Sequence, residues 1–322
     1  MNTEESRAQD LFAVPEQRSL WQDALEQLFR NRLAIFGVLV ALLLLFISIF
    51  GPWLAPYDYA EGNFMRIDEP PSRDHWLGTD GLGRDMFTRI LYGARTAFLV
   101  GLIVTIGTTV LGVVLGAAGA FLGGWVDFIV MRLADITMAF PDILLAAFIS
   151  VVFREKVLEL QIQMQEEYGW SLSESNRVYL DYMVIFGALT LVQWYGKARL
   201  VRGQILSLRE KEFIEAERAL GASNWTIILS HLVPNSLGPL IVSITVGFGG
   251  AMLSEASLSF LGVGIQPPGA SWGAMINDNL GQWRFKPHLV VMPGIVLAIV
   301  VLGFNFLGDG LNDALNPEQR RR

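Results

Sequence analysis

Long runs without a charged residue constrain this chain more than any other feature of its sequence. Residues 33–57 carry no charge, and neither do residues 96–126. About 20 apolar residues in a helix cross the hydrocarbon core of a bilayer, so each run is long enough to span a membrane. Charged residues make up only 17% of the chain, against roughly 25% in soluble globular proteins. The sequence therefore predicts an all-α integral membrane protein.

About six transmembrane helices are expected from the apolar runs. The second run contains regularly spaced glycines, which suit close packing between membrane helices. The fourth run is the weakest, because it is short and reaches span length only by including its neighbours. The predicted spans are residues 33–57, 96–126, 128–153, a stretch around 182–196, a fifth that begins near Pro234, and 289–308.

The distribution of basic residues orients these spans. Short cytoplasmic loops are enriched in Lys and Arg, and residues 197–218 and the triple arginine at 320–322 are the basic segments outside the apolar runs. Placing both segments inside puts the N- and C-termini in the cytoplasm. The predicted organisation is a cytoplasmic segment with an amphipathic helix (1–32), a first transmembrane helix (33–57), an extracytoplasmic loop (58–95), a core of five further spans (96–310) that includes an acidic outer loop (154–181), and a cytoplasmic tail (311–322).

One pair of opposite charges falls within the third predicted span. Arg132 and Asp135 are three residues apart, so on a helix they share a face and can pair. Ionisable residues inside a membrane are costly and often functional. The alternative is a pair near the membrane edge that only fixes helix packing.

Several function classes lack the residues that they need. The chain has no cysteine and only three histidines, which are widely separated, so neither a thiolate centre nor a catalytic zinc site is expected. No phosphate-binding loop of the Gly-x-x-x-x-Gly-Lys-Ser/Thr type occurs. The net charge of -7 gives no basic field for nucleic acid. We expect no catalytic residue, no metal and no cofactor in this chain.

A candidate coupling segment lies at residues 209–234. It reads as a short helix, a glycine break and a proline that marks the entry to the fifth span, which also fits an ordinary helical hairpin ended by glycine. A helix that protrudes between two spans could receive force from a soluble partner. The candidate coupling residues are Phe213, Glu215, Ala216, Glu217, Ala219, Leu220, Gly221, Ala222, Ser223 and Pro234.

This segment resembles the EAA loop of ABC importer permeases. Glu215, Ala216 and Gly221 match the pattern, whereas Glu217 and Val233 depart from it. Three further motifs, at 75–96, 255–273 and 307–317, resemble permeases of the dipeptide and oligopeptide C type, so the likeness runs in order from about residue 19 to residue 317. The family-motif residues, which the resemblance suggests are structural, are Gly78, Thr79, Asp80, Gly83, Arg84, Asp85, Gly93, Arg95, Arg132, Asp135, Glu255, Ser257, Phe260, Gly262, Pro267, Trp272, Gly273 and Asp309.

The resemblance implies a type I ABC importer permease fold in the cytoplasmic (inner) membrane. The implied partners are a second permease of the B type, two ATPase subunits that carry ATP and Mg²⁺, and an extracytoplasmic solute-binding protein. The implied cargo is di- or oligopeptides, with nickel or another small solute as the alternative. A secondary transporter or channel is the competing class, but it would need no docking loop.

Overall fold

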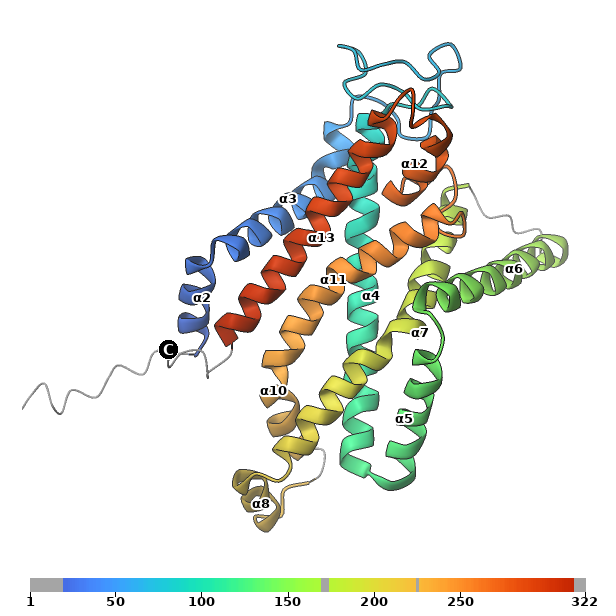
Figure 1. Cartoon of the computed structure of the whole chain (residues 1–322). Coiled ribbons are helices and arrows are strands. Elements are labelled where there is room, and N and C mark those ends of the chain that lie inside the picture. The colour runs from blue at the N-terminus through green and yellow to red at the C-terminus, as the bar shows by residue number, and fades with distance from the viewer. Residues whose placement is uncertain (1–19, 169–173, 224–225, 316–322) are drawn as a thin grey trace, which may run out of the picture.

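The computed structural model describes residues 20–168, 174–223 and 226–315, and these ranges are mostly helical, apart from the long loop at residues 55–85 (Figure 1). Within them there is no β-strand, and a single bridge joins Thr79 to Asp85. The triple arginine of the tail lies outside the described residues. The helices are α2 (Leu20–Arg30), α3 (Arg32–Leu54), α4 (Met86–Leu122), α5 (Gly124–Met138), α6 (Asp142–Tyr168), α7 (Glu174–Leu208), α8 (Glu212–Ala219), the π-helix η1 (Ile227–Leu232), α10 (Val233–Asn235), α11 (Leu237–Phe260), α12 (Trp272–Asn279), the 3₁₀ turn η2 (Leu280–Gln282) and α13 (His288–Leu315).

Four of the described helices are long and apolar enough to cross a membrane, namely α3, α4, α11 and α13. The consecutive pair α5 and α6 provides a fifth candidate, bent by 95° between its two helices. The break contains Pro141, and a proline disfavours helical backbone at the residue before it. The third predicted span, residues 128–153, therefore falls on two helices that meet at a sharp bend.

The fourth predicted span, around residues 182–196, falls on α7, which is long enough to cross a membrane but less apolar than the other four helices. Lys197, Arg199 and Arg202 interrupt its apolar sequence. Figure 1 nevertheless shows α7 running the length of the bundle beside α4, from the end near α12 to the end where α8 lies. The start of α3 and the end of α13 lie together, because Leu28, Ala34 and Ala314 form one buried cluster. A chain that returns to its starting side crosses an even number of times, so if the α5–α6 pair is one span, the sixth crossing that we expect falls to α7.

The acidic stretch that we expected as an outer loop is mostly helical. Helix α6 continues to Tyr168 and α7 begins at Glu174, so few residues are left between them. The sequence after Phe153 is rich in Glu, Gln, Leu and Lys, which are strong helix formers. The side chain of Arg154 donates to Asp181 at 3.0 Å and to the carbonyl of Gly264 at 2.8 Å, and these bonds tie the two helices to the loop after α11.

Small residues let the long helices approach closely, as predicted from the glycine spacing. A Cβ atom added at Gly112 of α4 would lie 2.6 Å from Cβ of Lys197 on α7. A Cβ at Gly303 of α13 would lie 2.7 Å from Cβ of Val40 on α3. Neither position has room for a larger residue, so the α4–α7 and α3–α13 contacts depend on these glycines.

The predicted Arg132–Asp135 pair does not form. The Arg132 guanidinium lies over the ring of Phe128, 5.4 Å from its centroid. Asp135 instead accepts a hydrogen bond from Arg199 of α7 at 2.5 Å. The spacing of the two residues within one helix allows them to pair, but Asp135 pairs with Arg199 of another helix instead.

Candidate functional site

The coupling segment is built around α8, a helix of two turns at one end of the bundle (Figure 1). Isolated helices this short are marginal in water, so its position must come from packing. Ile214 is fully buried and belongs to a cluster with Val201 and Ile205 of α7 and with Ile227 and Leu232 of η1. This side chain therefore packs α8 against α7 and against η1, which leads into α11.

The other side of α8 is open and partly apolar. Phe213 is 43% exposed and Leu220 is 83% exposed, and Glu215, Ala216 and Ala219 are exposed as well. Exposed large apolar side chains at the centre of a polar surface are typical anchors of protein interfaces. Sequence reasoning identified this exposed face but missed Ile214, which follows Phe213 directly and is buried whereas Phe213 is exposed.

The glycine break ends α8 in a defined way. Gly221 has φ of +82°, a conformation in which side-chain-bearing residues are strained. Its amide donates to the carbonyl of Arg218, and the amide of Ala222 donates to the carbonyl of Glu217, both at 3.0 Å. This pair of bonds is the Schellman arrangement that closes helices with glycine. No atom lies within 4 Å of the place where a Cβ would be, so the backbone conformation and not the space requires glycine.

Beyond the break, polar contacts hold the chain as it returns to the membrane. The hydroxyl of Ser223 accepts a hydrogen bond from the amide of Thr226 at 3.2 Å. Glu217, which departs from the EAA pattern, lies 3.4 Å from Nε2 of His231. The extra carboxylate therefore has a partner within its own chain. Pro234 lies in α10, the short helix that leads into α11.

Two contacts tie the end of α7, just before α8, to the turn between α4 and α5. Arg202 makes a bidentate pair with Asp127, at 2.5 and 2.7 Å. Arg209 donates to the carbonyl of Ala120 at 3.1 Å. The turn itself runs through Gly123 and Gly124, which both have positive φ. Sequence reasoning recorded these arginines as a basic segment and did not identify their partners.

At the opposite end of the bundle, residues 55–85 and α12 form a cap, which we call the outer cap after the predicted orientation (Figure 1). The family-motif residues Asp80 and Arg84 are buried there and paired at 2.7 Å. Thr79 donates to the carbonyl of Arg66 at 2.5 Å. Asp85 accepts from the amide of Thr88 at 2.7 Å, which caps α4. Gly78 and Gly83 both have positive φ angles, which the turns of this segment require.

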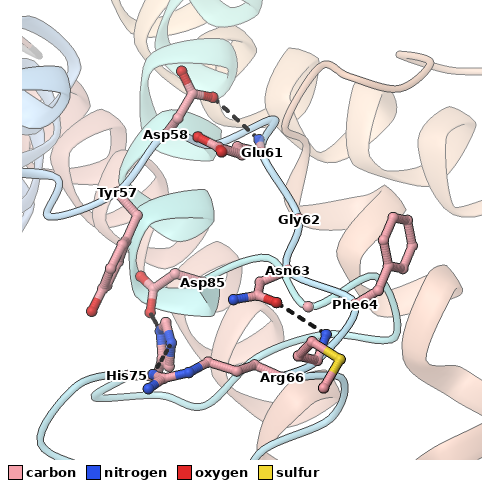
Figure 2. A pocket seen from close by; sticks show the side chains of 11 residues that line it. Tyr57, Asp58, Glu61, Gly62, Asn63, Phe64, Arg66, His75 and Asp85 are labelled. Atoms are coloured by element: carbon pink, nitrogen blue, oxygen red, sulfur yellow. Dashed lines mark hydrogen bonds and ion pairs between the residues drawn. The ribbon is translucent and has the colours of Figure 1, made fainter.

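A cavity of about 680 Å³ opens in this cap, lined by residues 57–58, 61–66, 75, 83 and 85 (Figure 2). Figure 2 shows Arg66, His75 and Asp85 converging on one side, whereas Phe64 points away from them. Arg66 has only donors, so Nε2 of His75 accepts from it at 3.2 Å and Nδ1–H donates to Asp85 at 2.9 Å. The polar wall of the cavity is thus fixed by a chain of three side chains, of which His75 and Asp85 are buried and Arg66 is partly exposed.

The remaining motifs pack beneath the cap. Trp272 of α12 is buried, donates through Nε1 to the carbonyl of Ile90 at 3.1 Å, and faces Gly93 of α4. Glu255 is buried and accepts from Ser259 at 2.6 Å. These contacts bring the motifs at 75–96 and 255–273 together. Among the other family-motif residues, Gly273 lies against the backbone of Ala256, and Gly262 has a positive φ angle. Pro267 lies in the loop between α11 and α12. The side chains that are at least partly exposed are those of Ser257, Phe260, Arg95 and Asp309.

Comparison with known proteins agrees with this arrangement. Residues 108–321 match the family described as "Binding-protein-dependent transport system inner membrane component", and residues 19–71 match the "N-terminal TM domain of oligopeptide transport permease C". The dipeptide transport system permease protein of Alkalihalophilus pseudofirmus is 41% identical, over 94% of this chain and 91% of its own length. The oligopeptide permease protein of Bacillus subtilis is 36% identical, over 94% and 91%, and the glutathione permease protein of Pectobacterium atrosepticum is 35% identical, over 94% and 92%.

Proposed function

The chain belongs to the family of binding-protein-dependent transport system inner membrane components, and from this premise we propose that it is the transmembrane subunit of an ATP-driven importer of dipeptides and oligopeptides. It is a multi-pass membrane protein with several apolar helices. The relatives named above are permeases for dipeptides, oligopeptides and glutathione, which supports a peptide as the cargo.

The observation that carries the proposal is the construction of α8. A short helix exposes Phe213 and Leu220 on one face and is anchored by Ile214 on the other. An ATPase subunit that binds the exposed face can therefore push on the membrane helices through the buried one. In this arrangement ATP and Mg²⁺ bind the partner subunits, and this chain contributes the receiving helix and half of the translocation pathway, in the manner of a type I importer.

The transport cycle follows from the connection of α8 to α7 on one side and to η1 and α11 on the other. Closure of two ATPases around ATP would move α8, and the helices joined to it would open the pathway toward the outer cap. By reciprocity, an outward-open pathway favours closed ATPases. The outer cap would then receive the solute-binding protein, a second permease of the B type would complete the pathway, and both termini would lie in the cytoplasm.

Co-purification of the tagged chain from its native membrane, with and without Gly221→Asp, tests this proposal. The wild-type chain should bring down ATPase subunits and a second permease. The variant should insert normally but lose the ATPases, because it combines a strained left-handed backbone with a new charge at the docking face. Gly281→Asp is the matched control: it adds the same charge in open space at the opposite end of the molecule and should keep the ATPase subunits and the second permease.

Two results would overturn the proposal. A Gly221→Asp variant that retains the ATPases and transports normally would remove α8 as the docking site. A wild-type chain that purifies alone, under conditions in which other membrane complexes survive, would favour a secondary transporter or a channel.

A further inference from the structure

A groove between α4 and α7 leads from the outer cap into the membrane-spanning part of the bundle. Its outer section is a pocket of about 220 Å³, lined by Tyr59, Tyr92, Arg95, Thr96, Leu99, Tyr179, Tyr182 and Ala270. Its inner section is an apolar pocket of about 680 Å³. The two share Leu99, Tyr179 and Tyr182, so they are adjacent sections of one groove.

The outer section is built from ordered tyrosines. The rings of Tyr59 and Tyr92 are stacked, with centroids 4.3 Å apart. Tyr182 stacks on Phe186 at 5.7 Å, and its hydroxyl lies 3.2 Å from the hydroxyl of Thr96. Tyrosine offers an aromatic face together with a polar tip, which suits a surface that contacts both apolar and polar parts of a ligand.

Arg95 lies at this aromatic mouth and is exposed. Within the described part of the chain, no carboxylate pairs with it. The preceding arginines of the same region behave differently: Arg84 and Arg89 are buried, and both lie against Asp80. A guanidinium ion binds a carboxylate through two parallel hydrogen bonds, so the groove presents an available anion-binding group directly beside an apolar chamber.

We propose that this groove is a subsite for the C-terminal end of the transported peptide. Arg95 receives the terminal carboxylate, the tyrosines contact the last peptide unit, and the apolar section receives the last side chain. The volume of the inner section exceeds that of any single side chain, so the subsite recognises the free carboxylate and accepts many residues before it. This inference rests on the proposed function, and it gives Arg95 a substrate-binding role in place of the structural role that its motif suggested.

Uptake of two peptides that differ only at the C-terminus tests the role of Arg95. The purified importer in liposomes would be supplied with a saturating binding protein that has been shown to bind both the free acid and the C-terminal amide. A charged hydrogen-bond pair corresponds to a preference of about tenfold to a hundredfold, and we expect the acid to be preferred by that factor in the transport KM. Arg95→Gln should abolish the preference, and Arg95→Lys should keep part of it.

A direct measurement of occupancy uses the absence of cysteine in the chain. Met183→Cys places a thiol in the apolar section, and Leu144→Cys on α6 is an exposed control outside the groove. The free-acid peptide should slow maleimide labelling of Met183→Cys several-fold, the amide should not, and Arg95→Gln should remove the protection. Labelling of Leu144→Cys should not change.

The outcomes separate this inference from the function on which it rests. If the wild-type importer takes up peptides but shows neither carboxylate preference nor protection at residue 183, the groove serves another surface, such as the partner permease, and only the subsite is refuted. If Arg95→Gln lowers uptake of acid and amide equally, Arg95 is structural and the subsite is again refuted. If the importer transports no peptide at all, both the proposed function and the subsite are refuted.

Discussion

Replacing Ile214 by alanine should detach the coupling helix from the membrane domain without disturbing the rest of the fold. The side chain is completely buried between α7 and η1, and truncating a buried isoleucine to alanine costs about 2–5 kcal/mol. Because α8 has only two turns and no side chain caps its start, the lost packing energy weakens the docking of α8 against α7 and η1. The ratio of docked to undocked α8 should drop by a factor of about 30 or more.

Two measurements on the assembled importer in liposomes report this change. Hydrogen exchange of the α8 amides should become faster, since local opening then needs less free energy. The number of peptides transported per ATP hydrolysed should fall, because ATPase closure would move a helix that no longer moves α7. Ile214→Val, which costs about 0.5–1.5 kcal/mol, should lie between alanine and wild type on both scales.

Phe213→Ala serves as the contrasting variant. It truncates the adjacent side chain on the exposed face, so it should weaken ATPase binding while α8 amides keep their protection. If Ile214→Ala shows wild-type exchange rates and wild-type coupling, the buried contact does not position α8, and the mechanical role assigned to it would be refuted.

Two further predictions concern contacts away from α8. Gly93→Val should lower the thermal midpoint of the detergent-solubilised chain, because its Cβ would lie 2.6 Å from the ring of Trp272 and overpacking costs about 1–3 kcal/mol; an unchanged midpoint would mean that the α4–α12 contact is loose. Arg202→Gln and Asp127→Asn, combined in a double-mutant cycle, should show a coupling energy of about 1 kcal/mol, a modest value because both side chains are partly exposed; additive effects would contradict the bidentate pair.

The apolar runs and the glycine spacing predicted most of the fold, because both depend on properties that a sequence displays directly. An uncharged run has to be buried or placed in lipid, and α3, α4, α11 and α13 follow from this alone. Helix α7 could not be predicted as clearly from its uncharged run. Its charged residues lower its hydropathy, and their compensation comes from other helices: Lys197 donates to Thr108 of α4, and Arg202 pairs with Asp127 of α5.

The same limit explains the Arg132–Asp135 prediction. The spacing of two charges within a helix is visible in the sequence, whereas the arginine that approaches Asp135 belongs to a helix about sixty residues later. At the coupling segment, one important residue could be identified from the sequence and another could not. Gly221 could be identified because the left-handed helix end requires glycine, but the importance of Ile214 depends on which side of α8 faces the bundle.

The contacts of α7 also bear on how far a displacement of α8 would travel. Arg202 and Arg209 bind Asp127 and the carbonyl of Ala120, on the two sides of the α4–α5 turn. A movement at the end of α7 either carries this turn along or breaks these bonds. Breaking them would cost about 1–3 kcal/mol, the size of a typical coupling free energy between distant sites. The charges that weaken α7 as a membrane span are therefore the groups that would make α5 and α7 move as one unit when α8 is pushed.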